Sequence, residues 1–353
     1  MSLEIYPSDF STRYGLYSAT ALMMSENYND IGKIQIVESL DDYAIQSLKV
    51  GNIVYNTDRG TTYVIVNVKS DTTLRQITAN GYSADWLLNK RCVAVKRKIV
   101  NIESGVYALI SDNLRGLPRI DLAKVKGLPD EFQKDDPSTE DEDESVIYGK
   151  ELLEQITDVL AYGEQGRRMT WNPDTFRWTF EIYKGSDLTG GIHAVAFVEE
   201  HGTCSDLVIN EDDSTYKNVA YIRYKYNDAE KLISVGQVDG VARRELWCSS
   251  TVIGENNQSE SAIKRKAQQQ AALELGKHLR RQSFTVTIDP AEFGVRYNLG
   301  DTVSCVSNRF GVSFTARVTG WKYELDSNGE KTSIVLGEPT LTAIGEMMLK
   351  NGN

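Results

Sequence analysis

The stretch VRYNLGDTVSC, residues 295–305, places a Leu-Gly-Asp turn between residues that favour extended backbone. Apolar residues alternate with polar neighbours on both sides of this turn, as in a half-buried strand: Val295, Tyr297, Val303 and Cys305. Gly300 and Asp301 interrupt the pattern where the backbone must bend or bulge. A second stretch, LKVGNIVYN at residues 48–56, has the same layout, so the sequence predicts this strand–turn unit twice.

The residues that follow the two stretches are also similar. Each stretch precedes a Val-rich strand and then a strand that ends at a glycine, Gly81 in the first copy and Gly337 in the second. From the turn glycine to this glycine is 30 residues in the first copy and 37 in the second, which also holds the hairpin tip DSNGEK. We therefore expect two similar small β-barrels, one near each end of the chain.

The overall pattern predicts an α+β protein that is mainly β and has several domains. Helical periodicity is found in four segments: residues 82–93, 103–114, 150–163 and 261–282. Strand-like segments fill residues 32–81, 191–250 and 283–353, and a hairpin is expected to turn at Asn172-Pro173-Asp174. The predicted domains are an N-terminal β-barrel-like domain (1–98), an α+β domain (99–200), strands with a linking helix (201–282) and a C-terminal β-barrel-like domain (283–353).

Two of the predicted helices carry specific expectations. In the helix over 82–93, Trp86, Leu87 and Leu88 should be buried. The helix over 261–282 has apolar residues every fourth position on one side, opposite Lys, Arg and Gln: Ile263, Ala267, Ala271, Leu275 and Leu279. We expect a solvated or partner-facing helix that links two domains, with binding to nucleic acid or a membrane surface as the alternative.

Bulk composition is that of an ordinary water-soluble protein of 353 residues, 41% hydrophobic and 25% charged. No apolar run approaches the roughly 18–20 residues of a membrane helix, and the N-terminus lacks the layout of a secretory signal. The net charge of −11 argues against a protein that grips nucleic-acid phosphates. Much of the acidity lies in DEFQKDDPSTEDEDE, residues 130–144, which predicts a solvated, mobile loop. A calcium loop is the alternative, but the spaced ligands and turn glycine are missing.

No group of residues has the pattern of a catalytic, cofactor-binding or metal site, so we predict none. His193, His201 and Cys204 could surround zinc, but no second pair of ligands accompanies them, and His278 lies on the polar side of its helix. GEQGRR, residues 163–168, lacks the strand and Lys-Ser/Thr of a phosphate loop. No nucleophile elbow occurs. The scattered cysteines, Cys92, Cys204, Cys248 and Cys305, are expected to be reduced thiols, which fits assembly in a cytoplasm.

The order of several motifs resembles the siphophage tail-tip or baseplate-hub family, the minor structural, hub-like tail proteins of long-tailed phages and prophages. These motifs are YKNVAYI, GVARREL, LELGKHLRR, VRYNLGDTVSC and TSIVLGEPTLTA, with ITANGYSADWLLNKR in the N-terminal part. They extend over nearly the whole chain, and the match lies in their order instead of in one diagnostic signature.

The resemblance implies a structural protein of the virion tail, assembled in the host cytoplasm, without enzymatic activity or a cofactor. It would form a homotrimeric hub at the distal tail tip, adapt the six-fold tail to a three-fold tip and surround the DNA exit channel. The implied partners are further copies of itself, the distal tail protein, other tail-tip proteins and the tape measure protein, with DNA only as cargo. Some family members carry a C-terminal lytic domain, and this sequence ends soon after TLTAIG.

Two other functions are considered. One is a tail-associated cell-wall hydrolase, or its hub portion without the lytic domain, with a site in residues 101–200 that includes Glu164 or Glu181. The other is a carbohydrate-binding module that uses Trp171, Trp178 and Tyr183 on the expected hairpin. These aromatic residues alternate as core residues do, which favours burial.

Overall fold

The computed structural model describes residues 2–16, 19–117, 119–132, 146–227, 229–236, 238–253, 258–276, 278, 281–309 and 312–337. The chain forms two compact units. The first comprises Met1–Asp135, Asp143–Val208 and Thr285–Pro339, and the second comprises Asp136–Glu142, Ile209–Phe284 and Thr340–Asn353. The predicted division into four domains stays a prediction.

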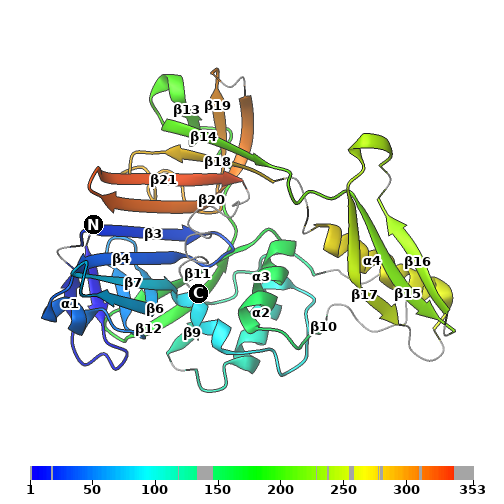
Figure 1. The fold of residues 1–353 in the computed structure, drawn as a ribbon, viewed down its shortest axis with the longest axis horizontal. Helices are drawn as coiled ribbons and strands as arrows, with labels where there is room; N and C mark the ends of the chain where they lie inside the picture. The colour runs from blue at the N-terminus through cyan, green and yellow to red at the C-terminus, as the bar shows by residue number, and fades with distance from the viewer. Residues whose placement is uncertain are drawn as a thin grey trace. The chain divides into compact units, whose positions relative to one another are not determined.

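A mainly β architecture is confirmed, and one sheet of 16 strands contains most of the strands (Figure 1). Its strands in the N-terminal part are β1 (Leu3–Tyr6), β2 (Tyr14–Leu16), β3 (Ala21–Asn27), β4 (Lys33–Ser39), β5 (Ile53–Asn56), β6 (Thr61–Asp71) and β7 (Gln76–Ser83). The middle part adds β9 (Ile120–Leu122), β11 (Gly166–Asn172), β12 (Arg177–Tyr183), β13 (Ala196–Val198) and β14 (Ser205–Asp212). The C-terminal part adds β18 (Arg281–Thr287), β19 (Thr302–Ser307), β20 (Val312–Asp326) and β21 (Gly329–Gly337).

Two sets of five strands within this sheet have the same order. We call β3–β7 the first repeat and β14 with β18–β21 the second repeat. Neighbouring strands run β5-β6-β7-β4-β3 in the first repeat and β19-β20-β21-β18-β14 in the second. The chain visits equivalent strands in the same sequence, and β3 pairs with β20, which joins the repeats into one sheet. Closed barrels stay a prediction, because the pairings of the described strands give one joined, open sheet.

The turn that precedes β5 and the turn that precedes β19 have the same backbone geometry. Gly51 has a φ of 91° and Gly300 a φ of 92°, in the left-handed region that favours glycine. The amide of Gly51 donates to the carbonyl of Ile65 at 2.8 Å, and the amide of Gly300 donates to that of Val318 at 2.7 Å. The return bonds match as well, since the Ile65 amide bonds Asn52 and the Val318 amide bonds Asp301. One β-bulge follows Ile65 in β6 and another follows Val318 in β20, so these two residues occupy equivalent positions in the two repeats.

This register corrects two details of the sequence interpretation. Gly81 pairs with Ile65 whereas Leu336 pairs with Val318, so Gly81 is equivalent to Leu336 and not to Gly337. The predicted strand over 295–305 begins only at Thr302. Residues before it form turns, in which Tyr297 is fully buried and Val295 is 81% exposed. The cause is the Asp301 carboxylate, which accepts the amide of Asn298 at 2.8 Å and folds that segment back.

One short helix lies within the first repeat, and further short helices lie between the repeats. Helix α1 (Asp42–Ser47) lies between β4 and β5, and after β7 come the 3₁₀ helix η1 (Ala84–Lys90), β8 (Arg97–Lys98), α2 (Ile102–Asn113), β10 (Val146–Ile147) and α3 (Leu152–Tyr162). Strand β8 pairs only with β10 among the described strands. The predicted helix over 82–93 corresponds to the shorter 3₁₀ helix η1, in which Leu87 and Leu88 are buried. Trp86 is only partly buried, because its ring stacks on Tyr82 at the surface.

The second unit is a small sheet with one helix. Strands β16 (Ala229–Val235), β15 (Val219–Tyr226) and β17 (Glu245–Ile253) lie in that order, and α4 (Glu260–Gly276) packs on one face through Ile263, Ala267 and Ala271. The predicted helix over 261–282 thus ends earlier, and β18 begins at Arg281. Its apolar side covers this sheet, which corrects the expectation of a linking helix; Leu279 lies outside the described residues.

Two other expectations differ from the structure. At the start of the strand-like segment over 191–250, only Ala196–Val198 of residues 191–198 is extended, and the short 3₁₀ helices η2 (Glu199–His201) and η3 (Gly240–Ala242) also lie within this segment. The predicted mobile segment begins with packed residues, since Phe132 is buried and Asp130 bonds Gln165, while 133–145 lie outside the described residues. No described helix has the length and apolar character needed to cross a membrane.

Candidate functional site

The junction of the two repeats is the most elaborate polar site in the first unit. Along this junction, Asn27 to Leu22 of β3 pair antiparallel with Gly320 to Leu325 of β20. Glu26 lies opposite Trp321 and forms a two-point ion pair with Arg59, with N···O distances of 2.6 Å. The Arg59 guanidinium also lies 4.6 Å from the Phe293 ring and 4.5 Å from the Trp321 ring. An arginine from the first repeat is therefore held by aromatic rings of the second.

Tyr28, in the turn after β3, is the packing centre of this junction. Its hydroxyl donates to the carbonyl of Glu164 at 3.0 Å, and its ring is buried. A Cβ on Gly166 would lie 2.1 Å from the Tyr28 ring, and a Cβ on Gly300 would lie 2.3 Å from it. The Arg317 guanidinium covers the ring at 5.3 Å. Gly300 thus serves the fold twice, through its left-handed backbone and through the absence of a side chain.

A cavity of about 430 Å³ opens beside this junction. Its walls come from β3, the start of β6, η1, β11 and the segment before β19. Charged residues of both signs line it: Glu26, Asp30, Asp58, Arg59, Asp85, Arg167 and Arg168. Four of these side chains are acidic and three are basic, and so nearly balanced a lining does not favour a site for a simple anion or cation.

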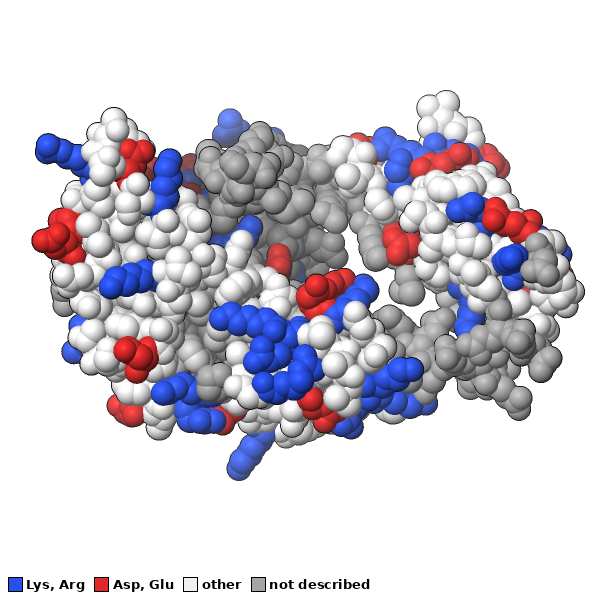
Figure 2. Space-filling view, turned by 60° about the horizontal axis from the view of Figure 1, so that its bottom comes forward, with Lys and Arg blue, Asp and Glu red and all other residues white. Residues whose placement is uncertain are grey.

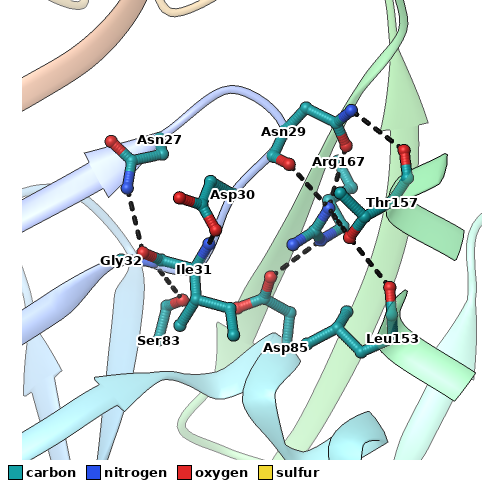
Figure 3. Close-up of polar contacts among 10 residues, drawn as sticks. All are labelled: Asn27, Asn29, Asp30, Ile31, Gly32, Ser83, Asp85, Leu153, Thr157 and Arg167. Atoms are coloured by element: carbon teal, nitrogen blue, oxygen red, sulfur yellow. Dashed lines mark hydrogen bonds and ion pairs between the residues drawn. The ribbon is translucent and has the colours of Figure 1, made fainter. Parts of the chain in front are cut away.

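Arg167 and Asp85 form the buried base of this cavity (Figure 3). Their side chains are 1% and 7% exposed, and Nε of Arg167 donates to Asp85 Oδ2 at 2.8 Å. Nη1 of Arg167 donates to Asn29 and to the Thr157 hydroxyl. Asp85 also accepts the hydroxyl hydrogen of Ser83, which in turn accepts the Gly32 amide. This network ties the first repeat to α3 and β11, over a sequence distance that no local pattern spans.

One polar atom of the network lacks a partner among the described residues. Nη2 of Arg167 is buried without a hydrogen bond, and Figure 3 shows a guanidinium nitrogen turned toward the side of Asp30 and Ile31. Burial raises the pKa of Tyr63, with a further contribution from Glu26, and burial also raises the pKa of Tyr183, so both nearby phenols stay protonated beyond the ordinary range of tyrosine. The arrangement holds chain segments together.

A basic face lies on the same unit, over η1, β8 and the C-terminal end of α2. Residues 89–126 contain nine Lys or Arg and three Asp or Glu in an acidic chain. The three acids are engaged: Glu103 is buried and accepts main-chain amides, Asp112 pairs with Arg97, and Asp121 pairs with Arg177. Figure 2 shows Lys and Arg side chains gathered on the forward face of the first unit. The net charge of the whole sequence is negative and does not reveal this local excess of positive charge.

The acids suggested for a hydrolase are not brought together as a catalytic pair. Glu164 pairs with Arg317 at 2.8 Å, whereas Glu181 pairs with Arg168 and Lys126, both at 2.6 Å. The cationic neighbours outweigh partial burial and lower the pKa of Glu181, which disfavours a proton donor there.

The aromatic residues suggested for carbohydrate binding are core residues. Trp171 is 6% exposed and Trp178 is 4% exposed, with ring centroids 4.6 Å apart. Tyr183 is partly buried and stands edge-on to Tyr28. The predicted burial of the two tryptophans is confirmed.

The residues considered for zinc do not form a metal cluster. His193 and His201 are exposed, in a turn and in η2, while Cys204 is buried. Across the described ranges, no group of three or more His, Cys, Asp or Glu side chains is placed to hold a metal ion. GEQGRR extends from the residue after α3 into the start of β11, and its two arginines form ion pairs instead of a phosphate loop.

The fold resembles that of phage tail proteins with known structures. A tail protein from Neisseria meningitidis MC58 superposes with a TM-score of 0.57 at 12% identity, covering 96% of each chain. The prophage MuSo2 43 kDa tail protein from Shewanella oneidensis gives 0.56 at 11% identity, with 96% of this chain and 99% of that chain covered. Prophage tail protein gp18 from Listeria monocytogenes EGD-e gives 0.50 at 14% identity over 99% of each chain. No curated protein sequence matches the chain significantly.

These similarities define the fold as that of a phage tail protein. The sequence profile of the Siphovirus ReqiPepy6 Gp37-like proteins matches residues 122–338, and the chain belongs to this siphovirus tail protein family. The expected phage tail membership is confirmed.

Proposed function

We propose that three copies of the chain form a ring-shaped hub at the distal end of the phage tail. The observation that carries this proposal is the duplication of five strands in one order, with equal turns at Gly51 and Gly300. Three copies with two repeats each present six similar sheets, so a three-fold ring can face a six-fold tail. Within one copy, the two repeats are already joined edge to edge through β3 and β20.

The role is structural instead of catalytic. The most buried polar network, around Arg167 and Asp85, connects the first repeat to the elements between the repeats. This network fixes the first repeat against the elements between the repeats, and the pairing of β3 with β20 fixes it against the second repeat, as a ring of constant diameter requires. DNA would pass through the ring as cargo, and the distal tail protein, other tail-tip proteins and the tape measure protein would contact its rims.

The assembly state tests this proposal directly. Light scattering of the purified chain should give three times 39.5 kDa, and electron micrographs should show rings with six similar densities. The measurement is repeated with co-expressed distal tail protein, since a neighbour can be required for assembly. A monomer in both preparations at high concentration would contradict the hub. Zymography on cell walls should show no clearing, and clearing that depends on Glu164 or Glu181 would favour a hydrolase.

A further inference from the structure

Strand β20 pairs with β21 along one edge, and its other edge is occupied by β19 and β3. Strand β19 pairs with Val312–Arg317, and β3 pairs with Gly320–Leu325 directly beyond it. The second repeat therefore has a slot on β20, residues Gly320–Leu325, and this slot is filled by a strand of the first repeat. This arrangement leaves no long unpaired edge on β20.

The equivalent slot in the first repeat is empty. Strand β5 pairs with Thr61–Val64 of β6 on the edge opposite β7, as β19 does on β20. Because Ile65 is equivalent to Val318, Asn67–Asp71 of β6 corresponds to the start of the filled slot. Within the described residues, no strand pairs with this part of β6 on that edge. Asn67, Lys69 and Ser70 are exposed there.

Repeat equivalence also says which strand is missing. In the chain order of the two repeats, β3 corresponds to β14. Strand β14 is the last strand of the sheet path, with β18 on one side and, among the described strands, none on the other. Ser205 and Asp206 are exposed, and Val208 is 56% exposed, on this end strand.

One copy does not use its own β14 to fill its own slot. In the strand order of the sheet, six strands separate β14 from β6, and the middle part of this order is visible in Figure 1. Each copy therefore presents one empty slot and one unused strand edge on different surfaces. A contact between two different surfaces is heterologous, and such contacts close rings when the rotation permits.

We infer that β14 of one copy pairs antiparallel with Asn67–Asp71 of β6 in the next copy, as β3 pairs with β20 within the chain. This inference rests on the proposed trimer and names its contact. It makes the junction between copies equivalent to the junction within a copy. The side chains are compatible with this strand pairing, because Lys69 is equivalent to Lys322, and Lys322 lies opposite Ser25 in the filled slot. Main-chain hydrogen bonds would give the affinity, as in strand addition to a sheet edge.

Engineered disulfides test the contact in the full-length protein. In a Cys92→Ser background, Lys69→Cys is combined in turn with Ser205→Cys, Asp206→Cys or Val208→Cys, so that several registers are covered. Oxidation should give covalent dimers and trimers on non-reducing gels for at least one pair. The matched control combines Lys49→Cys, exposed in the first repeat outside the slot, with Val208→Cys, and it should stay monomeric on the gel.

Hydrogen exchange gives a second readout without substitutions. In the assembled protein, amides of Asn67–Asp71 should exchange as slowly as those of Gly320–Glu324, and dilution to monomers should speed only the first set. A trimer with no cross-link from any pair and with fast exchange at Asn67–Asp71 would overturn this inference and leave the hub intact. A wild-type protein that stays monomeric both alone and with co-expressed distal tail protein would overturn both.

Discussion

The two glycine turns share one backbone geometry but lie in different surroundings. At Gly51, an added Cβ would meet only the Ser8 Cβ, at 4.0 Å. At Gly300, it would meet the ring of Tyr28 at 2.3 Å, and Gly185 also packs directly on Gly300. The first turn is thus a local bend, whereas the second is the point where the repeats and the connection between them meet. Duplication supplied the same turn twice, and only one copy became a packing centre.

Substitution of Gly300 by alanine should have the largest effect. The left-handed φ costs about 1–3 kcal/mol for a non-glycine residue, and forcing a methyl group against Tyr28 adds about 1–3 kcal/mol or more. Tyr28 cannot move away, because its hydroxyl is bound at the Glu164 carbonyl. We expect Gly300→Ala to lower the free energy of unfolding by about 2–6 kcal/mol, measured by urea denaturation.

Gly51→Ala is the matched control for this comparison. It introduces the same backbone strain at φ 91° without a close contact, so a loss of about 1–3 kcal/mol is expected. Equal losses for the two variants would mean that the packing around Tyr28 contributes nothing.

The first repeat is held by the buried ion pair, and its loss should be the next largest effect. Arg167→Met leaves the Asp85 carboxylate buried with Ser83 as its remaining described side-chain partner, so the free energy of unfolding should fall by about 3–5 kcal/mol. Arg168→Met removes the neighbouring arginine, whose pair with Glu181 is exposed, and should cost below about 1 kcal/mol. Urea denaturation of both variants distinguishes a buried anchor from a surface pair.

The residues after the two glycines are specialised in opposite ways. Asn52 donates from Nδ2 to the Ser47 carbonyl at 2.8 Å, a local bond within its own turn. Asp301 accepts the Ser186 amide at 2.7 Å and the Asn298 amide at 2.8 Å, so it also fixes the connection between the repeats. Asp301→Asn should cost about 1–3 kcal/mol, because one acceptor oxygen becomes a donor that faces an amide.

The reciprocal change, Asn52→Asp, should also destabilise the protein, since it removes a donor and buries a charge. Thermal denaturation of both single variants checks the pair. If either exchange leaves the melting temperature unchanged, the two turns are interchangeable and the specialisation is wrong.

Sequence reasoning succeeded where a signal is local. Glycine followed by Asn or Asp between alternating apolar residues marks a positive φ, and both turns were predicted on that basis. Trp171 and Trp178 were predicted to be buried because a two-residue period places both on one face of the hairpin. The prediction placed Val295 in a strand, but the Asp301 carboxylate accepts the Asn298 amide and folds the chain back. The alternation of apolar and polar residues does not reveal such a bond.

The candidate site depends on contacts far apart in the sequence. Asp85 and Arg167 are 82 positions apart, and β3 and β20 pair across almost the whole chain. Arg167 was visible only as one of two arginines in GEQGRR, and nothing in that motif separates the buried one from its exposed neighbour. A two-residue period does separate them, since β11 alternates between buried and more exposed side chains from Arg167 to Asn172.

Among these changes, the thiols should have the smallest effect on the free energy of unfolding. The thiol of Cys305 tests the second repeat alone. Cys305, in β19, aligns through the glycine turns with Asn56 of the first repeat, so only the second repeat carries a thiol there. Burial raises the pKa of Cys305 to about 11, and burial, with Glu199 and Glu200, raises the pKa of Cys204 to about 11. At pH 8, a thiol reagent should therefore modify the exposed Cys92 quickly and these two slowly.

Linkage then gives the sign of a pH dependence. Both native thiols bind protons more tightly than unfolded thiols, whose pKa is near 9. The stabilisation is complete below that value and is lost as pH rises from about 9 to about 11. Cys305→Ala should flatten this alkaline loss, as measured by urea midpoints from pH 8 to pH 11. If the urea midpoint of Cys305→Ala falls with pH as steeply as that of the parent protein, the Cys305 thiol is not protected by burial. Solvent would then reach this position of β19 as freely as it reaches the protein surface.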